Sequence, residues 1–344
     1  MTPGCYTAII TPFHGGEVDM DGLAGLVEFQ VANGVAGIVA VGTTGESPTL
    51  TWDEHNRVIV SVAELTRGKG LCIAGTGSNN TSETLSATEH AVRGGADAVL
   101  LVDPYYNGPS SLEIRREYLE PVAAAFPEIE VIPYVIPGRT GTRLLPEDLA
   151  IAGRNFSNIS TVKEATGDFD NMRRIRSCCG EGFSILSGDD NLTCAMMTDP
   201  GIKACGVVSV YSNIFPKEIS AMVGALASGD ENTGRDISNR LAPLFELVTV
   251  TTSEKTPFGP VTCRARNPLP VKTLMSILGM PSGGCRRPLG RMTRKGIELV
   301  LDAARKVFET SPEFFEPVAE FFDTDVEARL NDPSALSDLA YNSY

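Results

Sequence analysis

Eight short apolar runs, rich in β-branched residues, recur through the first 209 residues at intervals of roughly 20 to 35 residues. Segments with helical periodicity separate them; one of these, residues 52–65, follows a capping box formed by Thr51 and Glu54. Strands that alternate with helices form a parallel sheet, and unbroken apolar strands are covered on both faces. We expect the strands at residues 6–10, 37–41, 71–74, 98–102, 131–135, 160–163, 184–187 and 206–209.

Eight strands predict an α/β fold that closes into a (β/α)8 TIM barrel. A doubly wound open sheet is the alternative, but its GxGxxG fingerprint is absent from the sequence. Helical segments at 214–228, 236–249, 271–278 and 291–308 exceed what the eighth barrel helix needs, so they indicate a C-terminal helical subdomain. We therefore expect a barrel at 1–225, the subdomain at 226–310, and an acidic extension at 311–344.

The composition argues against several kinds of partner and metal site. The 344 residues are 42% hydrophobic, enough for a large core, and the formal net charge is −14, which disfavours nucleic acid and anionic membranes as partners. No apolar run could span a bilayer, and no basic residue precedes Arg57, so we expect neither an anchor nor a leader. The eight cysteines form no CxxC pair, which favours reduced thiols over zinc ligands. We expect a cytoplasmic protein.

In a barrel the chemistry gathers where the strands end. Lys163 ends the sixth strand, where burial disfavours its charged form and frees a neutral amine to attack a carbonyl. An ion pair with Glu164 is the alternative, but strand alternation points that carboxylate to the other face. Arg139 follows the fifth strand in a Pro/Gly frame, where its planar donors suit a carboxylate or a surface ion pair. The turn at 42–47, GTTGES, offers donors for an anion, although such residues are also common in ordinary turns.

Five motifs at strand ends together resemble the dihydrodipicolinate synthase family, pyruvate-dependent class I aldolases that also include N-acetylneuraminate lyase. They are GTTGES (42–47), DPYYN (103–107), the segment from Tyr134 to Gly141, VKEATGD (162–168) and SGDD (187–190). The resemblance covers about residues 4–307.

The resemblance implies a catalytic role for each matching residue. Lys163 would form a Schiff base with pyruvate, and the enamine would attack an aldehyde. Thr43, Tyr106 and Tyr134 would relay protons, with Tyr106 donated across a tight dimer interface. The remaining substrate contacts would come from Thr44, which holds the pyruvate carboxylate, and from the carbonyls of Gly188 and Val208.

Arg139 favours the synthase branch, in which an arginine at this place binds the carboxylate of aspartate-4-semialdehyde. The product would be 4-hydroxy-tetrahydrodipicolinate, in lysine and diaminopimelate biosynthesis, with no metal or organic cofactor. Another pyruvate aldolase, acting on sugar acids or N-acetylneuraminate, is the first alternative, and a non-catalytic metabolite-binding barrel is the second. Family members are usually tetramers built from tight dimers, so the resemblance implies a homodimer or homotetramer.

Four features depart from the family pattern. Val135 replaces a common Asn, and Gly138 replaces a Ser. The polar stretch at 251–265 is longer than is typical of the family. The tail after about Phe308 has no family counterpart; its eight acidic residues and one basic residue within 311–344 suit solvent, while its phenylalanines require burial. We expect two short helices there, docked on the subdomain or on a neighbouring subunit.

A second site matches the family's lysine-inhibition site. An acidic group would hold the ammonium of L-lysine and polar groups its carboxylate, which predicts allosteric inhibition. Packing of the helix after the second strand is the alternative role for two of these residues, Trp52 and His55. The matching positions are Ser47, Trp52, His55, Asn79, Glu83 and Tyr105.

Overall fold

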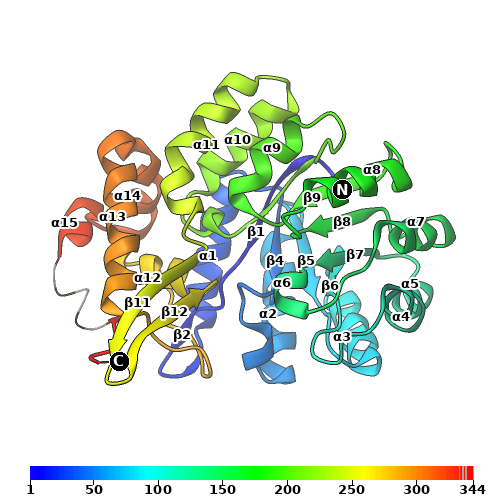
Figure 1. The fold of residues 1–344 in the computed structure, drawn as a ribbon, viewed down its shortest axis with the longest axis horizontal. Coiled ribbons are helices and arrows are strands. Elements are labelled where there is room, and N and C mark those ends of the chain that lie inside the picture. The colour runs from blue at the N-terminus through cyan, green and yellow to red at the C-terminus, as the bar shows by residue number, and fades with distance from the viewer. Residues whose placement is uncertain (333, 335–336, 338, 344) are drawn as a thin grey trace.

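The eight expected strands form one closed parallel barrel in the computed structural model, which describes residues 1–332, 334, 337 and 339–343 (Figure 1). Around the barrel the strands follow the order β1-β10-β9-β8-β7-β6-β5-β4. The strands are β1 (Gly4–Ala8), β4 (Gly37–Ala40), β5 (Leu71–Gly75), β6 (Ala98–Val102), β7 (Glu130–Val135), β8 (Thr161–Glu164), β9 (Ser184–Ser187) and β10 (Gly206–Ser209). The predicted fold class is confirmed. A short hairpin of β2 (Phe13–His14) and β3 (Glu17–Val18) precedes the first helix.

Helices surround the barrel and connect its strands. The predicted capping box starts α2, with the Thr51 amide donating to Glu54 Oε2 at 2.9 Å. The helices of this layer are α1 (Met20–Ala32), α2 (Trp52–Thr66), α3 (Thr81–Arg93), α4 (Ser111–Glu113), α5 (Glu120–Ala125), α6 (Pro137–Thr140), α7 (Pro146–Asn155), α8 (Phe169–Cys179), α9 (Thr193–Thr198) and α10 (Pro216–Ala227). Short 3-10 turns η1 (Ser47–Thr49), η3 (Asp190–Leu192) and η4 (Tyr211–Asn213) lie between them.

The expected helix at 111–125 contains a π-helical segment, η2 (Ile114–Leu119), between α4 and α5. Pro121 lies at the start of α5 and has no amide hydrogen to donate to the carbonyl of Glu117. That carbonyl accepts from the Thr81 hydroxyl at 2.8 Å instead. The local widening of the helix therefore follows from the proline.

Two apolar cores hold the barrel together. The larger lies between strands and helices, and the smaller fills the barrel interior with side chains such as Tyr6, Ile73 and Leu186. Tyr134 and Val208 belong to the interior core, whereas Val135 belongs to the outer one. Successive residues of β7 thus point to opposite faces of the barrel wall, as the two-residue repeat of a β-strand requires.

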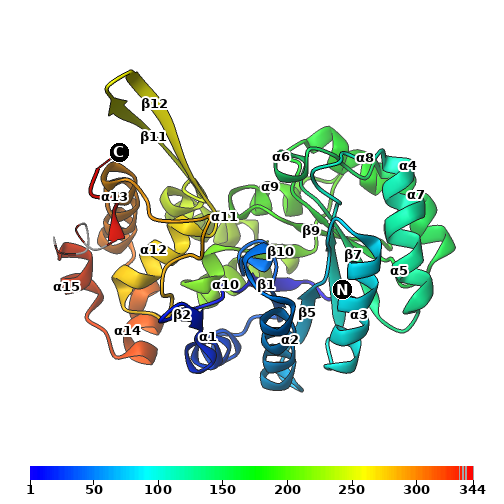
Figure 2. The ribbon, with the colours of Figure 1, turned by 90° about the horizontal axis from the view of Figure 1, so that it is seen from below.

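The C-terminal part contributes α11 (Glu231–Phe245), α12 (Leu269–Leu278) and α13 (Arg294–Thr310). The expected helix at 236–249 starts earlier, because the Asp230 side chain accepts the Thr233 amide as an N-cap. It also ends earlier, because Thr249 begins a strand. The polar stretch is an antiparallel hairpin of β11 (Thr249–Thr256) and β12 (Gly259–Arg266), which projects away from the helices (Figure 2).

The tail forms η5 (Pro312–Phe315), α14 (Glu316–Phe322) and α15 (Val326–Asn331). Phe315 packs edge-on against Phe215, the residue before α10, with ring centroids 5.0 Å apart. Phe322 lies 5.1 Å from Phe29 of α1, measured between ring centroids. The expected short helices are therefore docked on this same chain. The part of the extension at 333, 335–336, 338 and 344 lies outside the described residues, and the three-part domain division stays a prediction.

Candidate active site

Lys163 and Tyr134 lie side by side at the ends of β8 and β7. They are register partners in the parallel pair, so their side chains point to the same face, into the barrel. Lys163 Nζ lies 3.9 Å from the centroid of the Tyr134 ring. Both side chains are buried, at 5% and 4% exposure. A single lysine therefore ends in the barrel interior against a phenol.

Burial lowers the pKa of Lys163 from 10.5 to about 7. The negative charge of Asp189 opposes this shift, while the positive charge of Arg139 adds to it. A large fraction of the side chain is therefore a neutral amine at neutral pH. A neutral amine is the form that attacks a carbonyl carbon.

Burial has the opposite effect on Tyr134, whose pKa it raises from 10.0 to about 12. The charge of Arg139 and the hydroxyl of Thr43 lower this pKa, while the charge of Asp189 raises it. The phenol thus stays protonated at neutral pH, next to a hydroxyl that can pass a proton onward. This arrangement suits a proton donor at a carbonyl oxygen.

Glu164 faces away from Lys163, as strand alternation predicts. Its carboxylate accepts hydrogen bonds from the Thr166 amide at 3.2 Å and from Asn171 Nδ2 of α8 at 3.1 Å. Burial raises its pKa to about 7. The lysine is therefore not neutralised by the acid next to it in sequence.

The turn 42–47 is held by the C-terminal subdomain. Asn267 Nδ2 donates to Thr44 Oγ1 at 3.0 Å, and Lys272 Nζ lies 2.7 Å from Glu46 Oε1. Glu46 has a φ of 57°, a left-handed conformation that is rare for a residue with a Cβ. Its other carboxylate oxygen accepts the Arg286 amide at 2.9 Å. These contacts fix the conformation of the turn that follows β4.

A cavity of about 580 Å³ opens above the barrel. It is lined by Thr43, Tyr134 and Arg139; Lys163 is not a lining residue but lies against the ring of Tyr134. The base of the hairpin also lines it, through Arg266 and Asn267. The structure thus brings together donors from three separate parts of the chain.

The other predicted substrate residues lie behind this lining. Thr44 is buried and accepts from the Asn267 amide, and Val208 packs in the barrel interior. A Cβ on Gly188 would come within 2.7 Å of Ala165 Cβ and 3.3 Å of Lys163 Cε. Only glycine therefore lets this backbone approach the lysine so closely.

Tyr106 lies outside the cavity. Its side chain is 93% exposed and its φ is +83°, so the backbone holds the ring outward in an uncommon conformation. The structure does not bring it to Tyr134 of the same chain. Its expected role in a neighbouring subunit stays a prediction.

Five of the six residues of the predicted lysine site line the same cavity, and Asn79 does not. His55 Nε2 is bonded to the Gly75 carbonyl at 3.0 Å, and burial lowers its pKa to about 4, so the ring is neutral. Trp52 stacks edge-on against His55, with centroids 5.1 Å apart. The five that line the cavity are Ser47, Trp52, His55, Glu83 and Tyr105.

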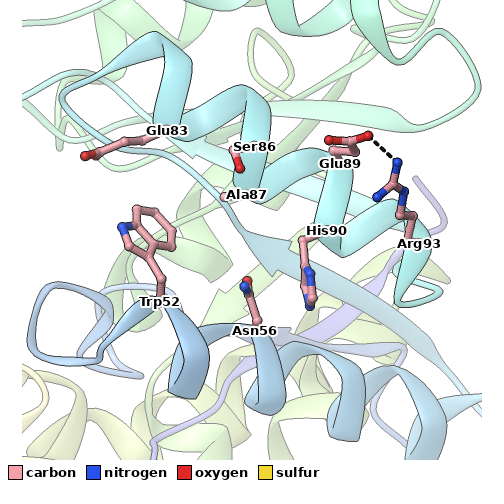
Figure 3. Close-up of a pocket in the computed structure, with 8 residues that line it drawn as sticks. All are labelled: Trp52, Asn56, Glu83, Ser86, Ala87, Glu89, His90 and Arg93. Carbon is pink, nitrogen blue, oxygen red and sulfur yellow. Dashed lines mark hydrogen bonds and ion pairs between the residues drawn. The ribbon is translucent and has the colours of Figure 1, made fainter.

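Trp52 and Glu83 also border a smaller cavity of about 260 Å³ between α2 and α3 (Figure 3). Asn56 and His90 extend toward this second cavity, and Glu89 pairs with Arg93 at its edge. The side chains of Trp52 and Glu83 therefore lie between the two cavities, and both line each of them.

The sequence patterns do not point to Asn267, Arg266 or Lys272, and Glu46 enters only as part of the turn 42–47. One signal was present for Lys272: it is a lone charge within the apolar helix LPVKTLMSIL. A charge at such a position requires a buried partner. The Asn267 contact spans 223 residues of chain and depends on how the subdomain packs.

No group of three or more His, Cys, Asp or Glu in the described residues is arranged to hold a metal ion. In the same part of the chain, no helix combines the length and apolar character needed to cross a membrane.

A closed (β/α)8 barrel with a buried lysine of low pKa beside a phenol defines a lyase of the class I aldolase type. The model of the dihydrodipicolinate synthetase family matches residues 1–306, and the chain belongs to that family. The 4-hydroxy-tetrahydrodipicolinate synthase of Syntrophus aciditrophicus (strain SB) is 41% identical over 298 residues, which cover 87% of this chain and 96% of that protein.

Solved structures of related proteins share the fold. The dihydrodipicolinate synthase from Aquifex aeolicus superposes with a TM-score of 0.81 and 37% identity, covering 91% of this chain and 99% of that one. The enzyme from Cyanidioschyzon merolae, solved with lysine bound, gives a TM-score of 0.80 and 34% identity, covering 88% and 97%. The resemblance inferred from the five motifs is confirmed.

Proposed function

We propose that this protein condenses pyruvate with L-aspartate-4-semialdehyde to give 4-hydroxy-tetrahydrodipicolinate, the step that commits carbon to lysine and diaminopimelate, in the cytoplasm. The observation that carries the proposal is the pair of Lys163 and Tyr134, a low-pKa amine 3.9 Å from the centroid of a protonated phenol ring. The relative that is 41% identical bears the name of this activity.

The first half of the reaction forms an imine on Lys163. The Thr43–Thr44 turn binds the pyruvate carboxylate, and the lysine nitrogen adds to the carbonyl carbon. Tyr134 gives a proton to the oxygen, which leaves as water. The resulting iminium withdraws electrons from the adjacent methyl group, so no metal or organic cofactor is required.

The second half forms the carbon–carbon bond. Loss of a methyl proton gives an enamine, whose carbon attacks the aldehyde, and the aldehyde oxygen takes a proton to become the hydroxyl. Arg139 holds the aldehyde's carboxylate. The amino group of the new chain then attacks the iminium carbon and displaces Lys163, which closes the ring. One water is released per turnover.

Two further properties belong to this proposal. The exposed Tyr106 completes the proton relay of a neighbouring subunit, so the active form is at least a dimer. L-Lysine binds at Ser47, Trp52, His55, Asn79, Glu83 and Tyr105 and inhibits the enzyme, in keeping with the lysine-bound structure of a relative.

Two measurements test the proposal. Borohydride reduction with pyruvate is expected to leave a mass adduct on Lys163 that is absent from Lys163→Met. A coupled assay is then expected to show turnover of aspartate-4-semialdehyde well above that of sugar-acid aldehydes. Absence of an adduct would refute the Schiff-base mechanism and favour a metabolite-binding barrel. An adduct with faster turnover of sugar-acid aldehydes would assign the protein to another branch of the family.

A further inference from the structure

The hairpin β11–β12 returns to the active site at its base. Its last residue, Arg266, lines the same cavity as Thr43, Tyr134 and Arg139. Its tip, by contrast, projects from the C-terminal helices (Figure 2). The base of the hairpin therefore places the positively charged side chain of Arg266 in the lining of this cavity.

Arg139 and Arg266 hold each other's segments in place. Arg266 Nη1 donates to the carbonyl of Gly138, the residue before Arg139, at 3.2 Å. Arg139 Nη2 donates to the carbonyl of Asn267, the residue after Arg266, also at 3.2 Å. The loop after β7 and the end of β12 are thus joined by two reciprocal hydrogen bonds.

Two departures from the family pattern meet at this contact. Gly138 stands where a Ser is usual, and Arg266 follows directly on the stretch that is longer than usual. The Arg266–Gly138 bond joins the two across 128 residues of chain.

The positive charges of the two guanidiniums are only partly balanced, because the charge of Asp189 acts on Arg139 from beyond ion-pair distance. Among the described residues, neither Arg139 nor Arg266 forms an ion pair; each donates to a neutral carbonyl. Burial lowers the pKa of Arg139, and the charge of Arg266 also lowers it, while Tyr134 and Asp189 act in the opposite direction. Two like charges at one cavity repel each other, and a bound anion relieves that repulsion.

The buried amide between them adds a further polar group. Asn267 is 7% exposed and its Nδ2 donates to Thr44, while its Oδ1 has no hydrogen-bond partner. A buried acceptor of this kind is costly unless a donor arrives.

We infer that Arg266 is a specificity-determining residue, which binds the carboxylate of the aldehyde substrate jointly with Arg139. The inference rests on the proposed function and extends it, because it assigns recognition of the second substrate to a residue of the hairpin. Pyruvate is expected to react at Lys163, which does not line the cavity that Arg266 lines. Arg266 therefore acts on the aldehyde step and leaves Schiff-base formation alone.

The test compares Arg266→Ala with Arg264→Ala. Arg264 is an exposed arginine one strand period earlier on β12, so its removal changes the same charge about 7 Å further along the hairpin. Arg266→Ala is expected to raise the KM for aspartate-4-semialdehyde at least fivefold. The KM for pyruvate and the yield of borohydride-trapped adduct are expected to change by less than twofold. Arg264→Ala is expected to match the unmodified protein.

Two further measurements separate recognition from a structural role. Arg266→Lys keeps the charge and is expected to recover part of the aldehyde KM. A neutral aldehyde without a carboxylate is expected to react equally with Arg266→Ala and the unmodified protein. An unchanged KM for aspartate-4-semialdehyde in Arg266→Ala, or an equal rise for pyruvate and for the neutral aldehyde, would overturn the inference. If the unmodified protein traps pyruvate but does not turn over aspartate-4-semialdehyde, the proposed function fails instead.

Discussion

Lys163 Nζ lies 3.9 Å from the centroid of the Tyr134 ring, and the two residues are direct register partners on adjacent strands. The β7–β8 register therefore positions the nucleophile and the proton donor without any loop. A site built on paired strands keeps its geometry when loops move. The consequences for reactivity can be measured.

The rate of imine formation is expected to follow the neutral form of Lys163. Its pKa is about 7, so the rate rises about tenfold per pH unit below 7 and levels off above it. Arg139→Gln removes a positive charge that helps to lower this pKa, and it should shift the midpoint upward. Quenched-flow trapping with pyruvate over a pH series measures both profiles. A midpoint near 10 in the unmodified protein would contradict the assignment.

Tyr134→Phe is expected to lower kcat by about two to four orders of magnitude, the usual contribution of a positioned proton donor. The ring that covers Lys163 remains, so the free energy of unfolding should change little. A coupled assay measures kcat, and thermal melting provides the control. A variant with near-normal kcat would show that the phenol does not transfer protons.

Lys272 is expected to be essential for stability. Its side chain and that of Glu46 are both fully buried, and Lys272→Met leaves that carboxylate without its ammonium partner. Breaking such a pair costs about 3–5 kcal/mol. Arg93→Met breaks an exposed pair with Glu89 and should cost only about 0.2–1 kcal/mol. Denaturant titration measures both values, and adding Glu46→Gln to Lys272→Met should restore part of the loss.

The sequence predicted the part of the site that strand ends supply. Lys163 is predicted because it ends an apolar run, and period 2 alone places Glu164 on the opposite face. The role of Tyr134 is implied only by the resemblance to the family. The contacts from Asn267 and Lys272 could not be predicted in this way, because they depend on how a subdomain more than 200 residues away packs over the barrel. The sequence does not predict the hairpin, because β11 is largely polar and its two faces therefore differ little in hydrophobicity.

Inhibition by L-lysine is expected to depend on Glu83 and not on Glu89. Glu83 lines both cavities between which Trp52 stands, while Glu89 borders only the smaller one. Glu83→Gln removes the charge that would pair with the ligand's ammonium, so inhibition at millimolar lysine should be lost while basal activity persists. Glu89→Gln is the matched control and should remain inhibited. Loss of inhibition in both variants would place the ligand in the smaller cavity.

The C-terminal extension is expected to contribute to the stability of the folded chain. Phe315 is 1% exposed and packs against Phe215 and Phe308, with centroids 5.0 Å and 5.5 Å away. Phe315→Ala should therefore lower the free energy of unfolding by about 3–5 kcal/mol, the range for a buried aromatic side chain. Phe258, at the hairpin tip, is 100% exposed, so Phe258→Ala should change it by less than about 0.5 kcal/mol. Equal stability of the two variants would show that the extension is not docked in solution.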